Sequence, residues 1–333
     1  MMTNPQTHDL QPLHSFRLPA KASNILYLKD IEQLAAIPKD AYVLGEGTNT
    51  IFLEDFEHPV VKVELAGIAI SETDSDWIVC VGAGENWHRL IINLMQRNIY
   101  GLENMALIPG TVGAAPVQNI GAYGREVGQF IYSVTAWDRK AQQLVELNNS
   151  ACEFAYRDSL FKRDPERWLI IEVTFNIPKL WVPETSYGEL KNITEPPTAK
   201  RIFDEVIAIR QRKLPDPKVL PNAGSFFKNP IITHAQLATL LRKYPNVPYF
   251  ETNNGDIKVA AGWLIDKLGL KGFHVGRASV HHNQALVLVN QGGASGAELL
   301  ELASYIQHCV ANEYGIDIDP EVRLLGRQGL RTL

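Results

Sequence analysis

The sequence predicts an α+β fold with more than one domain. Short apolar runs of strand length and amphipathic helical stretches both recur along the chain. A length of 333 residues, at roughly 150 residues per domain, suggests two domains. Two prolines, Pro215 and Pro217, interrupt the pattern after a long helical stretch and mark the best candidate for a domain boundary.

The N-terminal block contains four predicted strands and one predicted helix. Apolar runs of three or four residues occupy positions 25–28, 42–44, 51–53 and 60–63, and a more polar helical stretch covers 31–36. Apolar runs this short are typical of strands. We therefore expect the order strand, helix, strand, strand, strand.

A second block begins with a predicted strand at 77–81 and a helix at 87–98. Apolar residues in the helix recur at the spacing of one buried face, at Leu90, Ile91, Leu94 and Met95. Further strands are predicted at 134–137 and 168–175. The block is therefore an α+β unit of moderate size, and a glycine-rich run lies inside it.

Three more helices are predicted towards the C-terminus. The first covers 199–213 and ends before Pro215, because proline cannot continue a helix. Leucines at positions 237, 240 and 241 indicate the second. The third begins at Ser295, where Ser-Gly-Ala-Glu forms a capping box and Glu298 can satisfy an amide at the helix start.

Composition and charge limit the classes of function. Lys and Arg number 32 against 37 Asp and Glu, and the net charge of −5 argues against a generally basic nucleic-acid binder. Three cysteines (Cys80, Cys152, Cys309) without C-x-x-C spacing indicate neither a disulfide framework nor a thiolate zinc site. No secretory signal or membrane span is evident, so we expect a cytoplasmic protein.

The segment Gly45-Glu46-Gly47-Thr48-Asn49 is a glycine turn between two predicted strands. Its small residues allow backbone amides to approach a phosphate. On this pentapeptide alone, a hairpin turn is the favoured interpretation. Neither this turn nor the one at 82–87 completes G-x-G-x-x-G, because Thr50 and Trp87 replace the last glycine, so a Rossmann dinucleotide fold is not supported.

The run from Pro109 to Gly124 consists almost entirely of small residues. Such a segment cannot fill a core by volume, but it can lie flat against a large planar or diphosphate-bearing ligand. Thr111 and Asn119 can add hydrogen bonds to such a ligand. We favour ligand binding over the alternative, a tightly packed internal loop.

Two polar segments could carry chemistry. Arg157 lies beside Tyr156, and a planar guanidinium suits a substrate carboxylate, although a surface ion pair with Asp158 is the commoner meaning of this motif. Ser225 lies in a glycine-serine turn, where a structural role is usual. Phe227 replaces the second glycine of a nucleophile elbow, which disfavours a hydrolase and leaves a serine proton donor open.

Other charged residues have ordinary explanations. Lys213 could bind an anion by its point charge, but a solvated lysine at a helix end is the default. His281 and His282 are adjacent and do not share a helical face, so we expect no metal site. Glu321 and Arg323, near the C-terminus, form by themselves an ordinary charged pair.

Taken together and in this order, the segments resemble the UDP-N-acetylenolpyruvoylglucosamine reductases, the flavoenzyme family also called UDP-N-acetylmuramate dehydrogenases. The resemblance runs from about residue 15 to residue 326. Its most specific pieces are residues 44–49, 109–124, 155–159, 210–215, 222–230 and 320–323.

The resemblance implies a two-subdomain FAD-binding fold of the p-cresol methylhydroxylase type, followed by an α+β substrate-binding domain. We therefore predict three parts, at 1–66, 67–213 and 214–333, rather than two. The family divides into types, and residues 181–187 resemble the first type, in which Tyr187 lies on a loop that covers bound substrate. Carried over by position, the cofactor-binding residues are Gly45, Gly47, Thr48, Asn49, Pro109, Gly110, Thr111, Val112, Gly113, Asn119, Gly121, Ala122 and Tyr123.

The implied reaction has two stages. NADPH reduces FAD, and hydride then passes to the enolpyruvyl methylene of UDP-N-acetylglucosamine enolpyruvate, a precursor of the bacterial cell wall. The resemblance assigns Arg157 to stabilise the developing negative charge, Ser225 to supply a proton and Glu321 to a place beside Arg157. The implied contacts to substrate or its diphosphate are Tyr156, Tyr187, Lys213, Asn229 and Gln284.

Two other functions remain open at this point. One is an FAD-dependent oxidase of a small alcohol or sugar on the same scaffold, since a fold does not fix a function. The other is a nucleotide-sugar sensor without catalysis. Beyond substrate and NADPH we expect no nucleic-acid or membrane partner, no metal and a monomeric chain.

Overall fold

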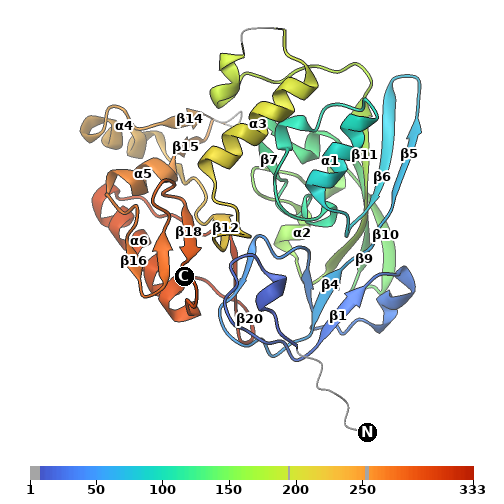
Figure 1. The fold of residues 1–333 in the computed structure, drawn as a ribbon, viewed down its shortest axis with the longest axis horizontal. Coiled ribbons are helices and arrows are strands. Elements are labelled where there is room, and N and C mark those ends of the chain that lie inside the picture. Colours follow the sequence, from blue (N-terminus) through green and yellow to red (C-terminus); the bar gives the residue numbers. More distant parts are fainter. Residues whose placement is uncertain (1–7, 194–195, 252–254) are drawn as a thin grey trace. The chain divides into compact units, whose positions relative to one another are not determined.

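The computed structural model describes residues 8–193, 196–251 and 255–333. Contacts group the chain into two compact units, which we treat separately (Figure 1). Residues 24–46 and 58–212 form the central unit, and residues 1–23, 47–57 and 213–333 form the terminal unit. The chain therefore leaves the central unit after Glu46 and returns to it at His58.

The central unit contains a small parallel sheet of order β1-β4-β2. Its strands are β1 (Ile25–Leu28), β2 (Tyr42–Leu44) and β4 (Val60–Val63), which confirms three of the predicted strands. The predicted helix between the first two forms as the 3₁₀ helix η2 (Ile31–Ala36), and Asp30 caps its first turn.

A five-stranded antiparallel sheet, of order β10-β9-β11-β6-β5, dominates the central unit. Figure 1 shows β5 and β6 as a hairpin at one edge of it. The predicted strands at 77–81, 134–137 and 168–175 are confirmed within it, whereas β5 and β10 were not predicted. Its strands are β5 (Ile68–Glu72), β6 (Asp76–Gly82), β9 (Ile131–Asp138), β10 (Gln143–Asn148) and β11 (Trp168–Pro178).

Helix α1 (Trp87–Gln96) packs on this sheet and confirms the helix predicted at 87–98. Trp87 is fully buried, its ring centroid lies 6.1 Å from that of Phe175 in β11, and its indole N–H donates to the Met105 carbonyl at 3.0 Å. The helix ends two residues earlier than predicted, where Asn98 adopts a left-handed conformation (φ +60°).

Helix α3 (Ala199–Lys213) has the bounds predicted from sequence. Its buried face is formed by Ala199, Ile202, Val206 and Ile209. Shorter helical elements complete the central unit, namely α2 (Leu160–Arg163), η3 (Glu103–Met105), η4 (Val112–Ala114), η5 (Val127–Gln129), η6 (Ser150–Cys152) and η7 (Gly188–Asn192). At the end of the glycine-rich run, β7 (Gly121–Ala122) pairs with β8 (Arg125–Glu126), which follows the run directly.

The terminal unit holds three small sheets, of order β12-β18-β17-β16, β13-β15-β14 and β20-β19-β3. Each of these strands has only two to four residues. β3 confirms the strand predicted at 51–53, whereas the other strands were not predicted. Their bounds are β3 (Thr50–Phe52), β12 (Asn222–Ser225), β13 (Ile231–Ile232), β14 (Tyr249–Glu251), β15 (Ile257–Val259), β16 (His274–Val275), β17 (Ala278–Val280), β18 (Val287–Asn290), β19 (Arg323–Gly326) and β20 (Gly329–Leu330).

The helices of the terminal unit are α4 (His234–Lys243), α5 (Ala261–Lys267), α6 (Gly296–Tyr314) and the 3₁₀ helix η1 (Gln11–Leu13). α4 and α6 confirm two predicted helices. The capping box at the start of α6 is present, because the Ser295 hydroxyl accepts the Glu298 N–H and the Glu298 carboxylate accepts the Ser295 N–H. α6 packs on β16 and β17 in the same unit.

The hairpin interpretation of the Gly45 to Asn49 turn is wrong. β2 pairs with β4 in the central unit, whereas β3 pairs in parallel with β19 in the terminal unit. The Arg323 N–H also donates to the Asn49 carbonyl at 2.9 Å. The turn therefore joins two sheets instead of two neighbouring strands.

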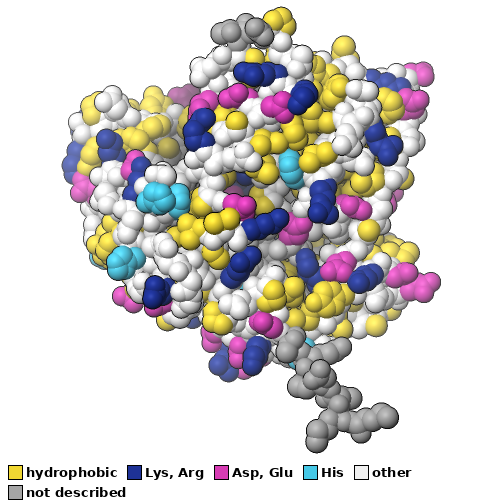
Figure 2. Space-filling view, viewed as in Figure 1, with side chains coloured by type: hydrophobic (Ala, Val, Ile, Leu, Met, Phe, Trp, Pro, Cys, Tyr) yellow, Lys and Arg dark blue, Asp and Glu magenta, His cyan; other side chains and the backbone are white. Residues whose placement is uncertain are grey.

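The division into parts at 1–66, 67–213 and 214–333 stays a prediction, since packing contacts do not report which ligand each part binds. In the residues that the structure describes, no helix has the length and apolar character needed to cross a membrane. On the face shown in Figure 2, acidic and basic side chains are interspersed.

Candidate active site

The first two residues of the predicted cofactor turn, Gly45 and Glu46, lie beside the glycine-rich run in the central unit. A Cβ added to Gly45 would be only 2.8 Å from the Thr111 hydroxyl oxygen, so the turn approaches the glycine-rich run closely. The Glu46 carboxylate accepts hydrogen bonds from the Asn86 side chain at 2.6 Å and from the Gly110 N–H at 3.1 Å. Glu46, which sequence reasoning did not assign, therefore fastens the turn to the run.

The middle of the run packs against the segment that follows β6. The Val112 N–H donates to the Glu85 carbonyl at 2.8 Å, and the Gly113 N–H donates to the Ala83 carbonyl at 2.9 Å. A Cβ on Gly113 would lie 2.5 Å from the Ala83 Cβ, so no larger residue fits there. Of the other predicted cofactor residues here, Pro109 is exposed and Ala122 is half-buried in β7.

Gly47 begins the part of the turn that belongs to the terminal unit. Its φ of +66° favours glycine, and an added Cβ would lie 2.1 Å from the Leu13 carbonyl oxygen. The Ser15 N–H donates to the Gly47 carbonyl at 3.0 Å, and Thr48 beside it is half-buried. The backbone here is fixed against the N-terminal segment.

Asn119 is buried and makes its contacts within the protein. Its amide nitrogen donates to the Glu126 carboxylate at 2.9 Å and to the Ala155 carbonyl at 3.1 Å, and its oxygen accepts the Gly128 N–H at 2.9 Å. The side chain thus links the glycine-rich run to the segment before Arg157. Its predicted contact with the cofactor stays a prediction.

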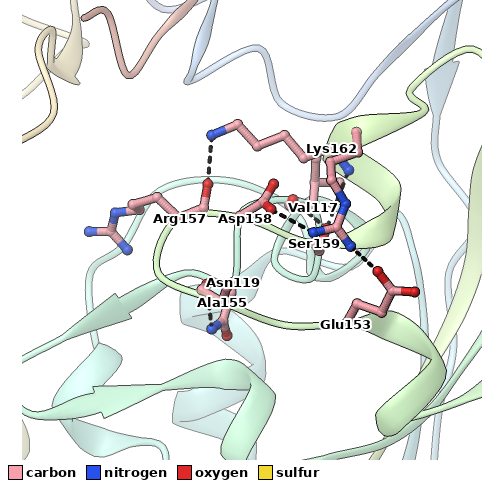
Figure 3. Close-up of polar contacts among 9 residues, drawn as sticks. Val117, Asn119, Glu153, Ala155, Arg157, Asp158, Ser159 and Lys162 are labelled. Carbon is pink, nitrogen blue, oxygen red and sulfur yellow. Dashed lines mark hydrogen bonds and ion pairs between the residues drawn. The ribbon is translucent and has the colours of Figure 1, made fainter. Parts of the chain in front are cut away.

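Arg157 adopts a left-handed conformation, with φ +52°, which is costly for a residue with a side chain. Its guanidinium donates to the Gly121 carbonyl at 3.4 Å and lies 5.7 Å from the centroid of the Tyr156 ring. Figure 3 shows this guanidinium pointing away from Asp158, whose carboxylate binds Arg163 at 2.7 Å. The strained backbone therefore directs Arg157 towards the glycine-rich run.

Two further hydrogen bonds fix the Arg157 segment to its surroundings (Figure 3). The Ser159 hydroxyl donates to the Val117 carbonyl at 2.6 Å, and the Lys162 ammonium donates to the Arg157 carbonyl at 2.6 Å. Ser159 is fully buried and also caps α2. The run and the arginine segment therefore form one connected structure.

Arg210, on α3, adds a second guanidinium that sequence reasoning did not assign. Its Nε is buried and has no hydrogen-bond partner in the described part of the chain. Burial lowers the pKa of Arg210, its interaction with Tyr123 opposes this shift, and Arg157 lowers the pKa further. Two like charges that interact in buried surroundings are unfavourable unless an anion binds near them.

The sequence of α3 contained a signal that Arg210 could contact a ligand. The residue follows Val206 by four positions and Phe203 by seven, so it continues an apolar row instead of the solvent face. An arginine on such a row is a candidate for a buried ligand contact.

Tyr123 and Tyr187 lie near these cations. Burial raises the pKa of Tyr123, the charge of Arg210 opposes this shift, and Tyr187 contributes a further small increase. Tyr187 is 48% exposed, and beyond it Glu189 and Arg212 form an ion pair. A predicted cofactor residue and a predicted substrate residue are thus electrostatic neighbours.

In the terminal unit, the structure brings the segments of Ser225 and Glu321 together. Ser225 ends β12 and pairs with Val287 in β18. The Glu321 N–H donates to the carbonyl of Phe226, the residue after Ser225, at 2.7 Å. The Asn49 side chain donates to the Glu321 carbonyl at 3.3 Å, so a predicted cofactor residue lies beside them.

The remaining predicted substrate residues of this unit have varied surroundings. The Asn229 side-chain oxygen accepts the Ala261 N–H at 3.0 Å, where α5 begins. Gln284 is half-buried, and its carbonyl accepts the Val287 N–H at 3.1 Å. Lys213 is exposed at the end of α3.

The metal prediction concerns His281 and His282. Their ring centroids lie 4.4 Å apart, and burial lowers the pKa of His281. Over the described ranges, no three His, Cys, Asp or Glu side chains are grouped closely enough to hold a metal ion.

The residues of the central unit fit a large anionic ligand such as FAD. The buried Nε of Arg210 lacks a partner, and its neighbour Arg157 carries the same charge. The adjoining run consists mostly of small residues, so a ligand can approach its backbone closely. Positive charge and a flat backbone surface match a diphosphate and a planar ring system.

Comparisons with known proteins identify two family matches. Residues 22–146 match the family described as FAD binding domain. Residues 216–325 match the family described as UDP-N-acetylenolpyruvoylglucosamine reductase, C-terminal domain. These matches confirm the expected order of an FAD-binding part followed by a distinct C-terminal domain.

Similar whole proteins support the same assignment. The UDP-N-acetylenolpyruvoylglucosamine reductase of Idiomarina loihiensis is 52% identical over 98% of this chain and 98% of its own. That of Pseudoalteromonas translucida is 46% identical over 96% of this chain and 95% of its own. The solved reductase from Thermus caldophilus, at 22% identity, covers 95% of this chain and 96% of its own with a TM-score of 0.66, which shows a shared fold. On these matches, the chain belongs to the UDP-N-acetylenolpyruvoylglucosamine reductase family.

Proposed function

We propose that this chain catalyses the NADPH-dependent reduction of the enolpyruvyl group of UDP-N-acetylglucosamine enolpyruvate to the lactyl ether of UDP-N-acetylmuramate. The reaction belongs to peptidoglycan precursor synthesis, and its cofactor is FAD. The observation that carries the proposal is Arg157, which is held in a strained conformation against the glycine-rich run and interacts electrostatically with Arg210, whose Nε is buried.

Arg157 binds the substrate carboxylate. When hydride adds to the terminal carbon of an alkene conjugated to a carboxylate, negative charge moves to the neighbouring carbon and into the carboxylate. A guanidinium bound there stabilises the charge, and burial strengthens the interaction. Arg210 adds a second positive charge to the same surroundings. FAD, when bound, supplies the hydride that it takes from NADPH.

Ser225 donates the proton that completes the reduction. Serine is a weak acid, but the carbon next to the carboxylate becomes strongly basic after hydride addition, so a positioned hydroxyl can protonate it. Glu321 cannot donate a hydrogen bond as a carboxylate. Glu321 therefore acts in its protonated form, through a water molecule, or by orienting Arg157 and the substrate.

The FAD-binding residues are those of the turn and the run. Those of the turn are Gly45, Gly47, Thr48 and Asn49. Those of the run are Pro109, Gly110, Thr111, Val112, Gly113, Asn119, Gly121, Ala122 and Tyr123. The close approach of Gly45 to Thr111 supports their action as one cradle.

The substrate contacts are Tyr156, Tyr187, Lys213, Asn229 and Gln284. We assign the chain to the first type of the family, in which the loop at 181–187 covers the substrate and Tyr187 contacts it. The interaction of Tyr187 with Tyr123 supports this assignment. We further propose that the parts at 1–66 and 67–213 bind FAD, that 214–333 binds substrate, and that the protein is a cytoplasmic monomer.

Flavin absorbance tests the proposed function. The purified protein should be yellow, NADPH should bleach it in the absence of oxygen, and the enolpyruvyl nucleotide should restore the colour. A colourless protein that takes up no added FAD would contradict the proposal. Peroxide formation without NADPH would instead indicate an oxidase, and tight UDP-sugar binding without turnover would indicate a sensor.

A further inference from the structure

The segment 181–187, which we call the Tyr187 loop, is held against other parts of the central unit by hydrogen bonds to Glu103, Asn104 and Arg125. The Trp181 indole N–H donates to the Glu103 carboxylate at 2.6 Å. The Arg125 guanidinium donates to the Val182 carbonyl at 2.9 Å. The Asn104 side chain donates to the Glu184 carbonyl at 2.8 Å. Each contact joins the loop to a residue far away in sequence.

Asn104 also binds the glycine-rich run. The same amide nitrogen donates to the Tyr123 carbonyl at 2.9 Å, so the two N–H groups of one amide hold two separate segments. The residue is only 1% exposed. A side chain this buried has one conformation available, which fixes the distance between the two carbonyls that it binds.

Gly124 and Glu184 form another close contact between the same two segments. Gly124 adopts φ +85°, and an added Cβ would lie 2.9 Å from Glu184 Cγ. The rings of Tyr123 and Trp181 pack against one apolar cluster, which includes Leu190 and Ile202. The end of the run and the Tyr187 loop therefore share both polar and apolar contacts.

We propose that Asn104 is a positioning residue that holds the Tyr187 loop against the end of the glycine-rich run, and so aligns the substrate loop with the cofactor segment. The proposal rests on the proposed function for the roles of the run and of Tyr187. It adds a residue to which the sequence analysis gave no role and whose amide N–H groups bind two protein carbonyls.

Removing the two hydrogen bonds of Asn104 has a definite physical consequence. In Asn104→Ala, two partly buried carbonyls, those of Tyr123 and Glu184, lose their donor. The loop then opens more easily, because an unsatisfied buried acceptor favours local exposure to water. Tyr187 is held less firmly, so more of the substrate binding energy is used to order the loop.

Hydrogen–deuterium exchange on the full-length, FAD-loaded protein tests this directly. We expect the backbone amides of 181–187 to exchange about tenfold faster in Asn104→Ala. The matched control is Asn149→Ala, since Asn149 also donates from one amide nitrogen to two carbonyls, those of Gly128 and Ile131 at 2.7 Å each. It should leave exchange in 181–187 unchanged. Unchanged exchange in Asn104→Ala would overturn the proposal.

A second variant keeps the test decisive if Asn104→Ala does not fold. Asn104→Leu keeps a branched side chain in the buried position and deletes both N–H donors, so faster exchange in 181–187 is expected again. In both variants KM for the enolpyruvyl substrate should rise about tenfold with little change in kcat. A tenfold loss of kcat with no change in KM would contradict the positioning role of Asn104. If the unaltered protein shows no turnover, the proposed function fails, while the exchange comparison still decides the role of Asn104.

Discussion

The two units hold their proposed catalytic groups in different ways. In the central unit, Arg157 has a strained backbone conformation, and its charge interacts with that of Arg210, whose Nε is buried. In the terminal unit, Ser225 ends a regular strand, and the Glu321 segment is joined to it by a backbone hydrogen bond to Phe226. One arrangement concentrates positive charge, and the other fixes the positions of two polar groups by strand pairing.

This difference follows from the two kinds of chemistry. Stabilising a developing charge depends on burial, because electrostatic interactions strengthen where water is excluded. Donating a proton depends on reach and alignment. A change in either unit should therefore affect a separate task within the same half-reaction, the reoxidation of flavin by the substrate.

The largest effect is expected for Ser225→Ala. Reoxidation of reduced flavin by the enolpyruvyl substrate should slow by about 10²- to 10⁴-fold, because this half-reaction needs the proton, while reduction by NADPH should be spared. Stopped-flow absorbance measures both rates. Ser279→Ala is the control, since Ser279 lies in the same sheet and binds Gln291. Equal slowing of both half-reactions would remove Ser225 from its assigned role.

Arg157→Lys should have the next largest effect. Lysine keeps the charge but loses the bidentate geometry, so reoxidation should slow by about 10²- to 10³-fold. Arg163→Lys, on the same segment but bound to Asp158 and Glu153, should change the rate little. If the two variants reacted alike, the assignment of the carboxylate to Arg157 would be wrong.

Acid should destabilise the terminal unit through His14. Burial lowers the pKa of His14 from 6.5 to about 4, against opposing effects of the Leu18 carbonyl and Asp9. Between these values the unfolded chain binds a proton that the folded chain does not, so stability falls as pH falls, by about 3 kcal/mol at pH 4. Urea unfolding at pH 7 and pH 4 should show a smaller loss in His14→Gln. An equal loss in both proteins would contradict the burial effect.

Local signals made some elements predictable from sequence. Helix α3 has its predicted bounds because Pro215 stops it, and α6 begins at its capping box. Strand β10 escaped prediction because it lies at a sheet edge, where most of its residues are exposed, and because its apolar residues do not alternate strictly with polar ones. The pairing of β3 with β19 joins residues far apart in sequence, which no local pattern encodes.

Prediction of the candidate site from sequence has the same limit, because a local pattern does not encode contacts between distant segments. Arg157 and the glycine-rich run were found because their residue types suggest ligand binding, and the structure joins them through Asn119 and Ser159. Glu46 and Asn104 act by fastening one loop to another, so their roles follow only from three-dimensional contacts. The residues that arrange a site are thus harder to predict than those that carry its charge.

A solvent isotope comparison tests the central claim most directly, namely that the protein donates a proton in the second half-reaction and not in the first. The holoenzyme is reduced by NADPH without oxygen and then mixed with the enolpyruvyl substrate, in H₂O and in D₂O. Reoxidation should be slower in D₂O, because it includes proton donation from an exchangeable hydroxyl, whereas flavin reduction by NADPH should proceed at the same rate in both solvents. A reoxidation rate that is insensitive to D₂O, or equal slowing of both half-reactions, would contradict the account.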